Sequence, residues 1–298
     1  MAAPQTLFVT GASGQLGRRV LAHLLDTHKV PPERVVAGTR NPERLADQAA
    51  RGVIVRRADF DDEAGLAAAF SGAARVLVIS TDKVDVPGAR LRQHQAAVAA
   101  ACKAGIKHVV YTSMMRPEPG SPIPFASDHY GTEQALAAAP LTWTILRDCW
   151  YTDYLLLSLS AALAIGQLRS AASDAGVAYV TREDCARACA AALTSESATR
   201  SKLDVTGPDP IGPAELAKMV SELTGRTLTH VPVTVDQLQA DLRAAGLPPP
   251  VVELMAAIDI NTRAGNVANV SDSVQKLTGK PPQSVREFLA AHAAELKR

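Results

Sequence analysis

GASGQLG, residues 11–17, lies directly between the apolar run TLFVT and the helical pattern RRVLAHLLD. Three glycines at a spacing of three, after a predicted strand and before a predicted helix, favour a phosphate-binding turn over a plain turn. Gly11 would make the tight turn, Gly14 would leave room for a pyrophosphate, and Gly17 would let the helix pack closely. The first N–H groups of the helix and its positive dipole end would face the phosphates. The neighbouring Ser13, Gln15 and Leu16 would also bind the cofactor.

The first half of the chain alternates short β-branched runs with segments of helical period. Most of the runs are apolar on both faces, as in strands that helices cover on either side. The runs span residues 6–10, 34–39, 53–58, 75–80, 108–113 and 142–147. Apolar stripes such as Leu16, Val20 and Leu24 predict the intervening helices. This order predicts an α/β fold with a doubly wound parallel sheet of the Rossmann type.

After about residue 150 the alternation stops, and the chain becomes mainly helical. Short extended pieces remain at residues 177–181 and 202–207. One predicted helix begins at Pro213 and ends at Gly225, and the final helix begins near Ser284. We therefore expect two domains: residues 1–150 bind the dinucleotide, and residues 151–298 form a smaller substrate-binding domain with some segments returning to the first.

Composition excludes several classes of partner. The chain has 298 residues, 47% of them hydrophobic, with 31 basic and 30 acidic side chains and no long run of one charge. Such a balance predicts a globular protein with a small-molecule partner and binding to neither nucleic acid nor membranes. The longest apolar stretch, residues 154–165, is short for a membrane span of about 20 residues. The start lacks signal-peptide features, so we expect a cytoplasmic protein.

Cysteine and histidine spacings give no sign of a disulfide framework or a metal site. The four cysteines form no C-x-x-C pair, and the seven histidines show no ligand spacing such as H-E-x-x-H. Cys185 and Cys189 lie one helical turn apart, which is typical of a packed helix face. We therefore expect no metal.

The residues after the second predicted strand indicate which dinucleotide binds. A carboxylate there would accept hydrogen bonds from a ribose 2′-hydroxyl, whereas a guanidinium pairs with a 2′-phosphate. The sequence has Thr39 and Arg40 and no acidic residue. We therefore predict NADPH as cofactor, with Arg40 as main contact and Arg44 as second cation; a solvated Arg40 is the alternative. Asp59 and Phe60 follow the third strand, where adenine would lie, although Phe60 fits the core equally well.

These residues support a family resemblance that runs nearly end to end. The chain resembles the NmrA-like group of atypical short-chain dehydrogenases, above all its bacterial NADPH-dependent quinone oxidoreductases, with triphenylmethane reductase as a near relative. The resemblance depends on the stretches VTGASGQLG, RNPER, HVVYTS, HYGTEQAL and TILRDCWYTDYL. It implies hydride transfer from NADPH to a flat or aromatic acceptor such as a quinone, in a cleft between the two domains.

The resemblance also implies roles for residues at the strand ends, where doubly wound sheets bind ligands. Side chains after the fourth and fifth strands would contact the cofactor, and aromatic ones after the sixth would border the substrate. The cofactor residues are Ser80, Thr81 and Thr112, with Ser113 beside the nicotinamide, and the substrate residues are Trp150, Tyr151 and Tyr154.

The chain departs from the family pattern at two positions. Relatives have a lysine at the position of Gln134 and an asparagine at that of Asp148. Tyr130 precedes Gln134 by four residues, so the two share a helix face with the spacing of a Y-x-x-x-K pair without its lysine. Our hypothesis makes Tyr130 a proton or hydrogen-bond donor to the acceptor, weaker than usual without the cation, with Ser113 orienting it. A tyrosine that only borders the pocket is the alternative.

Asp148 has two interpretations that the sequence does not separate. Its carboxylate would accept a hydrogen bond from the nicotinamide carboxamide, or it would form an ion pair with Arg147 or Arg182. The missing lysine also keeps a second function in view, an NADP(H)-sensing regulator without catalysis, while a nucleotide-sugar epimerase would need the intact pair. A homodimer is a further expectation to test.

Overall fold

The computed structural model describes residues 6–197 and 199–296. The opening residues 1–5, which begin the stretch without signal-peptide features, and residues 297–298, which end the second expected domain, lie outside the described part.

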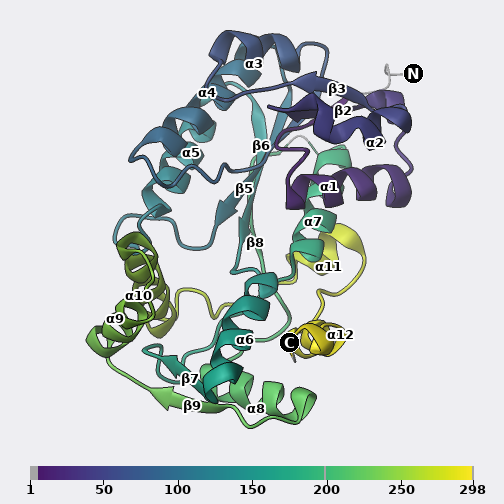
Figure 1. The fold of residues 1–298 in the computed structure, drawn as a ribbon. Helices are drawn as coiled ribbons and strands as arrows, with labels where there is room; N and C mark the ends of the chain where they lie inside the picture. The colour runs from purple at the N-terminus through teal and green to yellow at the C-terminus, as the bar shows by residue number, and fades with distance from the viewer. Residues whose placement is uncertain (1–5, 198, 297–298) are drawn as a thin grey trace.

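The centre of the protein is a parallel sheet in the order β3-β2-β1-β4-β5-β6-β8 (Figure 1). This confirms the predicted doubly wound sheet. The order reverses between β1 and β4, and such a reversal opens a crevice at the carboxyl ends of the strands. The strands are β1 Leu7–Val9, β2 Val35–Thr39, β3 Ile54–Arg57, β4 Arg75–Val78, β5 His108–Met114, β6 Thr142–Asp148 and β8 Ser201–Val205.

Helices cover both faces of this sheet because its strands bury alternate residues on opposite sides. In β1, Leu7 and Val9 join the core on one face, and Phe8 joins the core on the other. The first face is covered by α1 Gln15–Ala22, α7 Arg182–Thr194 and α11 Ser273–Thr278. The second is covered by α3 Glu63–Phe70, α4 Ala89–Lys103 and α5 Ala126–Ala138 (Figure 1).

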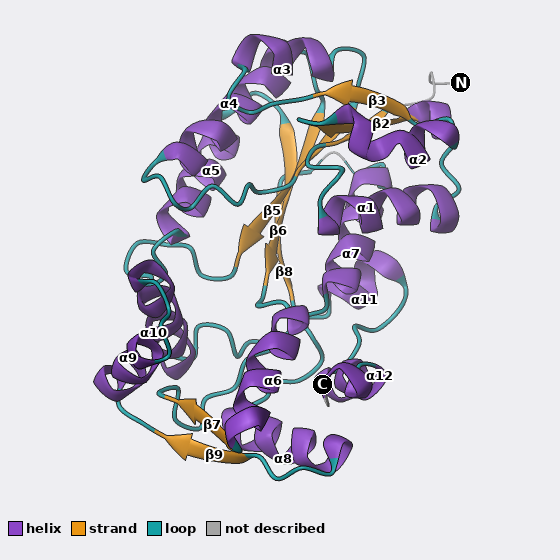
Figure 2. Cartoon of the chain, in the orientation of Figure 1, coloured by secondary structure: helices purple, strands orange, loops and turns teal. Residues whose placement is uncertain are grey.

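The second half of the chain contributes to the sheet and also builds a separate region. The extended piece expected at residues 202–207 becomes β8, which pairs with β6, whereas residues 177–181 form only isolated bridges. Figure 2 shows the carboxyl ends of β5, β6 and β8 pointing toward the separate region. That region comprises α6 Leu155–Ile165, β7 Gln167–Ser170, α8 Pro213–Thr224, β9 Thr229–Pro232, α9 Val235–Ala244, α10 Pro249–Arg263, α12 Val285–Ala291 and α13 Ala293–Leu296.

Local signals explain several element ends. The expected helix from Pro213 is present and ends at Gly225, whose φ of +73° lies in the left-handed region. Ser284 caps α12 through a capping box with Glu287. The remaining short elements are a π-helical turn at His23–Thr27, α2 Ala46–Ala50, and the 3₁₀ turns Pro32–Arg34, Pro42–Leu45 and Thr152–Tyr154.

Residues 6–197 and 199–296 contain neither a membrane-spanning helix nor a metal-binding cluster. None of the helices there combines the length and the apolar character that a membrane crossing requires. No group of three or more His, Cys, Asp or Glu side chains there is arranged to hold a metal ion.

Candidate functional site

The glycine turn connects β1 to α1 at the crevice in the sheet. Gly11 has a φ of +57°, which glycine adopts without strain. A Cβ on Gly17 would lie 2.4 Å from the Gly11 carbonyl oxygen and 2.7 Å from Ala12 Cα, so only glycine lets α1 pack this closely. No side chain caps the start of α1, and Gly14 and Gln15 are exposed there. The first-turn N–H groups are therefore free to bind an anion such as a pyrophosphate.

The end of β2 is held against this turn. The hydroxyls of Ser13 and Thr39 lie 2.8 Å apart, and Thr39 Oγ1 also accepts from the Asn41 N–H at 3.2 Å. Arg40 follows directly and is exposed, as is Arg44. Their positions beside the glycine turn fit a 2′-phosphate.

Arg18 is a third cation at this corner that the sequence reasoning missed. It lies on the first turn of α1, and its guanidinium donates to the Arg44 carbonyl and pairs with Asp47 at 3.2 Å. The Gly-x-x-Gly-Arg spacing, with the arginine one residue after Gly17, was the only available signal.

The residues after β3 remain consistent with both interpretations of Phe60. Phe60 is half-buried and packs against the core on the α3 face. Asp59 accepts from the Asp61 N–H at 3.1 Å, which shapes the turn. Core packing and a free edge for adenine therefore coexist.

The ends of β4 and β5 bring three expected cofactor residues together. The Ser80 N–H donates to Thr112 Oγ1 at 2.9 Å, and the two hydroxyls lie 3.3 Å apart. The neighbouring Thr81 N–H donates to His94 Nε2 at 3.0 Å, so a buried histidine on α4 fixes this loop. Sequence reasoning assigned no role to His94.

The motif H-x-x-T-E, formed by residues 129–133 at the start of the stretch HYGTEQAL, fastens α5 to the sheet. His129, Thr132 and Glu133 are all buried on the face of α5 that meets β5. Ser113 Oγ donates to Glu133 Oε1 at 2.7 Å, so Glu133, not Tyr130, is its hydrogen-bond partner. Sequence reasoning used the motif for the resemblance but assigned His129 and Glu133 no structural role.

Tyr130 and Gln134 lie away from that buried face. Tyr130 is half-buried and Gln134 is exposed. The expected shared face is therefore present, and it is free of the buried hydrogen bonds that hold the helix. The contact between Tyr130 and an acceptor remains a prediction.

Glu133 anchors a charge network at the carboxyl ends of β5 and β6. It pairs with Arg147 at 2.6 Å and with Lys202 at 3.2 Å, and Arg147 also pairs with Glu118 at 2.7 Å. Burial alone would lower the pKa of Arg147, but the hydrogen bonds and charges of Glu133 and Glu118 outweigh it and raise that pKa. Glu133 is therefore the main ion-pair partner of Arg147.

Asp148 is a buried carboxylate without a cationic partner. Arg147 pairs with Glu133, and Arg182 pairs with Asp153 at 2.9 Å, so the ion-pair interpretation of Asp148 is wrong. Its Oδ2 accepts from the Tyr151 hydroxyl at 3.0 Å, its buried Oδ1 has no N–H or O–H donor, and the Cys185 thiol also contacts the carboxyl group. Burial raises the pKa of Asp148 to about 7. An oxygen that lacks a donor fits the alternative, a contact with a carboxamide NH₂.

The expected substrate residues form an aromatic group beside Asp148. The Tyr151 and Tyr154 rings stack with centroids 6.1 Å apart, and the Arg182 guanidinium lies 5.0 Å and 5.2 Å from their centroids. Trp150 packs between two apolar clusters, and its buried Nε1 has no partner. Tyr154 is 65% exposed, which leaves a wide aromatic face for a flat ligand.

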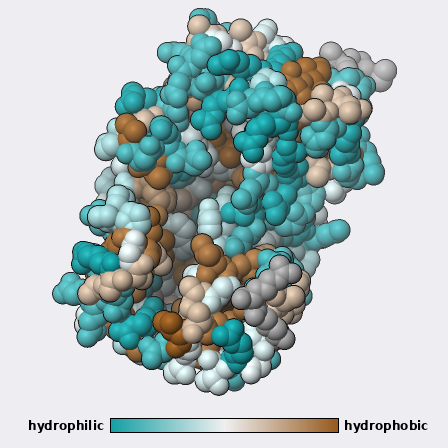
Figure 3. All heavy atoms as spheres, in the orientation of Figure 1, coloured by the Kyte–Doolittle hydropathy of each residue, from teal (hydrophilic) through white to brown (hydrophobic). Residues whose placement is uncertain are grey.

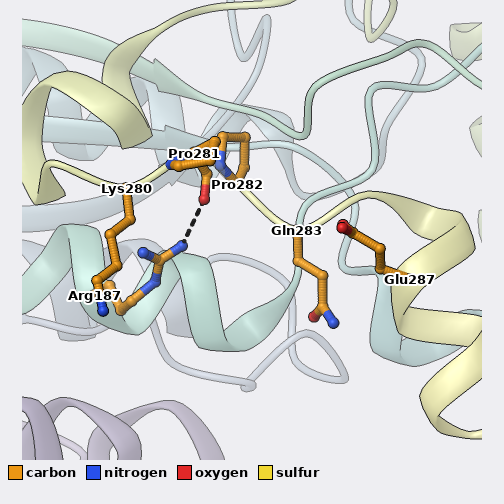
Figure 4. Close-up of a pocket in the computed structure, with 6 residues that line it drawn as sticks. All are labelled: Arg187, Lys280, Pro281, Pro282, Gln283 and Glu287. Atoms are coloured by element: carbon orange, nitrogen blue, oxygen red, sulfur yellow. Dashed lines mark hydrogen bonds between the residues drawn. The ribbon is translucent and has the colours of Figure 1, made fainter.

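The surface outlines this region. Figure 3 shows a hollow between the sheet and the second region, with apolar surface gathered below it over α6 and α10. A different, shallow pocket adjoins α7 and α12, where Arg187 donates to the Pro281 carbonyl at 3.1 Å (Figure 4). None of the expected site residues lines it; the lining residues are Arg187, Lys280, Pro281, Pro282, Gln283 and Glu287.

Comparison with known proteins defines the class. A model of an NAD(P)H-binding family matches residues 11–196, which include the glycine turn, Arg40 and the strand ends. The chain belongs to this NAD(P)H-binding family. An NmrA-like family domain-containing oxidoreductase of Aspergillus flavus is 29% identical over 77% of this chain and 75% of that protein.

Two reductases match along nearly the whole chain. Quinone oxidoreductase 2 of Escherichia coli is 35% identical over 95% of this chain and 96% of its own, and the crystal structure of the E. coli NADPH-dependent enzyme with NADPH superposes with a TM-score of 0.90 over 98% and 100% of the two chains. Triphenylmethane reductase of Citrobacter, crystallised with NADP(H), has a TM-score of 0.89 at 35% identity, over 97% and 100%. The resemblance and the fold expected from the sequence are thus confirmed.

Proposed function

We propose that the protein is an NADPH-dependent reductase that transfers a hydride to a quinone-like or other aromatic acceptor. The observation that carries the proposal is the meeting, at the carboxyl ends of β4, β5 and β6, of Thr112, the buried Asp148 carboxylate, whose Oδ1 has no N–H or O–H donor, and the Tyr151–Tyr154 stack. The first two suit a nicotinamide, and the third suits a flat acceptor. The related quinone and triphenylmethane reductases support this reading.

In this proposal the residues hold a cofactor that supplies the hydride. The N–H groups after Gly14 bind the pyrophosphate, Arg40 and Arg44 bind the 2′-phosphate, and Asp148 Oδ1 accepts from the carboxamide. Arg18 keeps the segment around Arg44 in position through its carbonyl.

On the acceptor side, the aromatic residues orient the substrate and Tyr130 supplies a proton. Trp150, Tyr151 and Tyr154 border the ring, and the apolar α6, with Leu157 82% exposed, covers it. Gln134 keeps a hydrogen-bonding group where relatives have a cation. Residues 151–298, apart from α7, β8 and α11, would form the acceptor domain. We further propose that the protein is cytoplasmic and that it forms a homodimer. Light scattering would test the dimer.

The test is oxidation of NADPH, followed by its near-ultraviolet absorbance, against a panel of quinones, aromatic ketones and dyes. Turnover with at least one aromatic acceptor supports the reductase. Tight NADP binding without turnover on any of them would instead support the NADP(H)-sensing regulator.

A further inference from the structure

Arg90 is a buried cation without an acidic partner. It is 7% exposed and lies in the first turn of α4. Its Nη2 lies 2.8 Å from His129 Nε2, its guanidinium carbon lies 5.1 Å from the Phe125 ring centroid, and its buried Nε has no partner. The described chain has two other buried arginines, and both donate to oxygen: Arg182 to Asp153, and Arg75 to the carbonyls of Ala192 and Ser197.

This setting disfavours the charge of Arg90. Burial without an ion pair is costly, and the first turn of a helix adds the positive end of the helix dipole. The nearby carboxylates of Asp128 and Asp82 offset only part of this cost, because burial still lowers the pKa of Arg90. His129 gives little compensation, because burial keeps its pKa well below the ordinary value and the ring stays neutral. A ligand that brings an acceptor oxygen to Nε or Nη1 would remove much of this cost.

The surroundings of Arg90 indicate the acceptor rather than the nucleotide. Phe125, on which the guanidinium lies, belongs to a cluster with Met114 at the end of β5 and Ala257 of α10, and Trp150 packs against the same cluster. The glycine turn and Arg40 lie at the ends of other strands, β1 and β2. Arg90 therefore stands beside the aromatic side of the site.

We propose that Arg90 binds a negatively charged substituent, such as a carboxylate or sulfonate, on the aromatic acceptor. This inference rests on the proposed function and narrows its substrate class to anionic aromatic compounds. The ring would lie against Phe125 and Trp150 while the anionic group accepts from the free N–H groups of Arg90.

The kinetic test compares a naphthoquinone sulfonate with the unsulfonated naphthoquinone. In Arg90→Gln, we expect the ratio of their kcat/KM values to fall about tenfold or more, because a charge-assisted hydrogen bond is lost. Arg90→Lys should keep most of the ratio. Arg92→Gln removes an exposed arginine from the same helix and should leave the ratio unchanged. A fall in kcat/KM for both quinones alike would overturn the proposal.

A binding test needs no turnover. Calorimetry on the NADP-loaded protein would compare naphthalene sulfonate with the uncharged naphthalene sulfonamide, and we expect the sulfonate to bind about tenfold more tightly. Equal affinities would overturn the proposal even in a protein with quinone reductase activity. A preference for the sulfonate in a protein that turns over no acceptor would sink only the reductase. Loss of NADPH affinity in Arg90→Gln would assign Arg90 to the cofactor and also overturn the proposal.

Discussion

The Ser113 hydroxyl donates to Glu133 Oε1 across 2.7 Å and so joins the carboxyl end of β5 to the buried face of α5. Glu133 is fully buried, and Arg147 donates to it through both Nε and Nη2, at 2.9 Å and 2.6 Å. Tyr130 belongs to the same helix, one turn earlier. The position of the proposed proton donor therefore depends on a buried carboxylate one turn further along the same helix.

Replacing Glu133 should destabilise the folded protein more than replacing Glu118, its neighbour in the charge network. Glu133→Gln leaves the Arg147 guanidinium with only the partly exposed Glu118, so we expect a loss of about 3 kcal/mol or more in the free energy of unfolding. Glu118→Gln, at the exposed end, should cost about 1 kcal/mol or less. Urea denaturation measures both, and similar losses for the two variants would show that the network does not depend on Glu133.

Arg40 should determine the choice between the two dinucleotides. Arg40→Ala should raise the KM for NADPH about tenfold to a hundredfold and leave that for NADH nearly unchanged, because only NADPH carries the 2′-phosphate. Arg51→Ala is the matched control, since it removes an arginine that pairs with Asp26 at the end of α2. An unchanged ratio of KM values in Arg40→Ala would assign the phosphate to Arg18 or Arg44.

The sheet could be predicted from the sequence because most of its strands are apolar runs and its first turn has strong glycine constraints. β8 was less evident: SKLDV has two charged residues and is only partly buried, as an edge strand allows. The glycine turn and the strand ends could be identified as the candidate site because parallel strands bring their carboxyl ends together at one edge of the sheet.

Contacts between distant side chains could not be read from spacing. Glu133 finds Arg147 fourteen residues away, and Thr81 finds His94 on the next helix. The sequence could not distinguish a carboxamide contact of Asp148 from an ion pair. The structure does so because Arg147 pairs with Glu133 and Arg182 pairs with Asp153. Nothing in the alanine-rich helical pattern around Arg90 indicated that this arginine would be buried.

Tyr130 and Gln134 allow a paired test of proton donation. Tyr130→Phe should lower kcat about a hundredfold with a carbonyl acceptor, at the low end for a general acid, because no lysine supports it. Gln134→Lys supplies, at an exposed position, the cation that the family resemblance led us to expect there, and it should raise kcat without destabilising the fold. Single-turnover rates would measure both effects. Were Tyr130→Phe to turn over like the parent, the proton would have to come from water.

Asp148 gives the protein a stability that should fall as the pH rises. Burial raises the pKa of Asp148 to about 7 in the folded protein, whereas the unfolded chain titrates near the ordinary value of about 4. Between these two values the folded protein holds a proton that the unfolded chain has lost, so the contribution is fully present below about pH 4 and is lost on the way to about pH 7.

Asp148→Asn removes this proton and keeps an oxygen for the Tyr151 hydroxyl. The free energy of unfolding of the variant should therefore gain on that of the parent by up to about 1.4 kcal/mol for each pH unit across that window. Asp209→Asn, at an exposed aspartate before α8, is the control for the loss of one negative charge. Parallel pH profiles for parent and Asp148→Asn would mean that the folded protein admits enough water to keep this carboxylate ionised. Water would then satisfy the Asp148 oxygen, and its burial would no longer support a contact with the carboxamide.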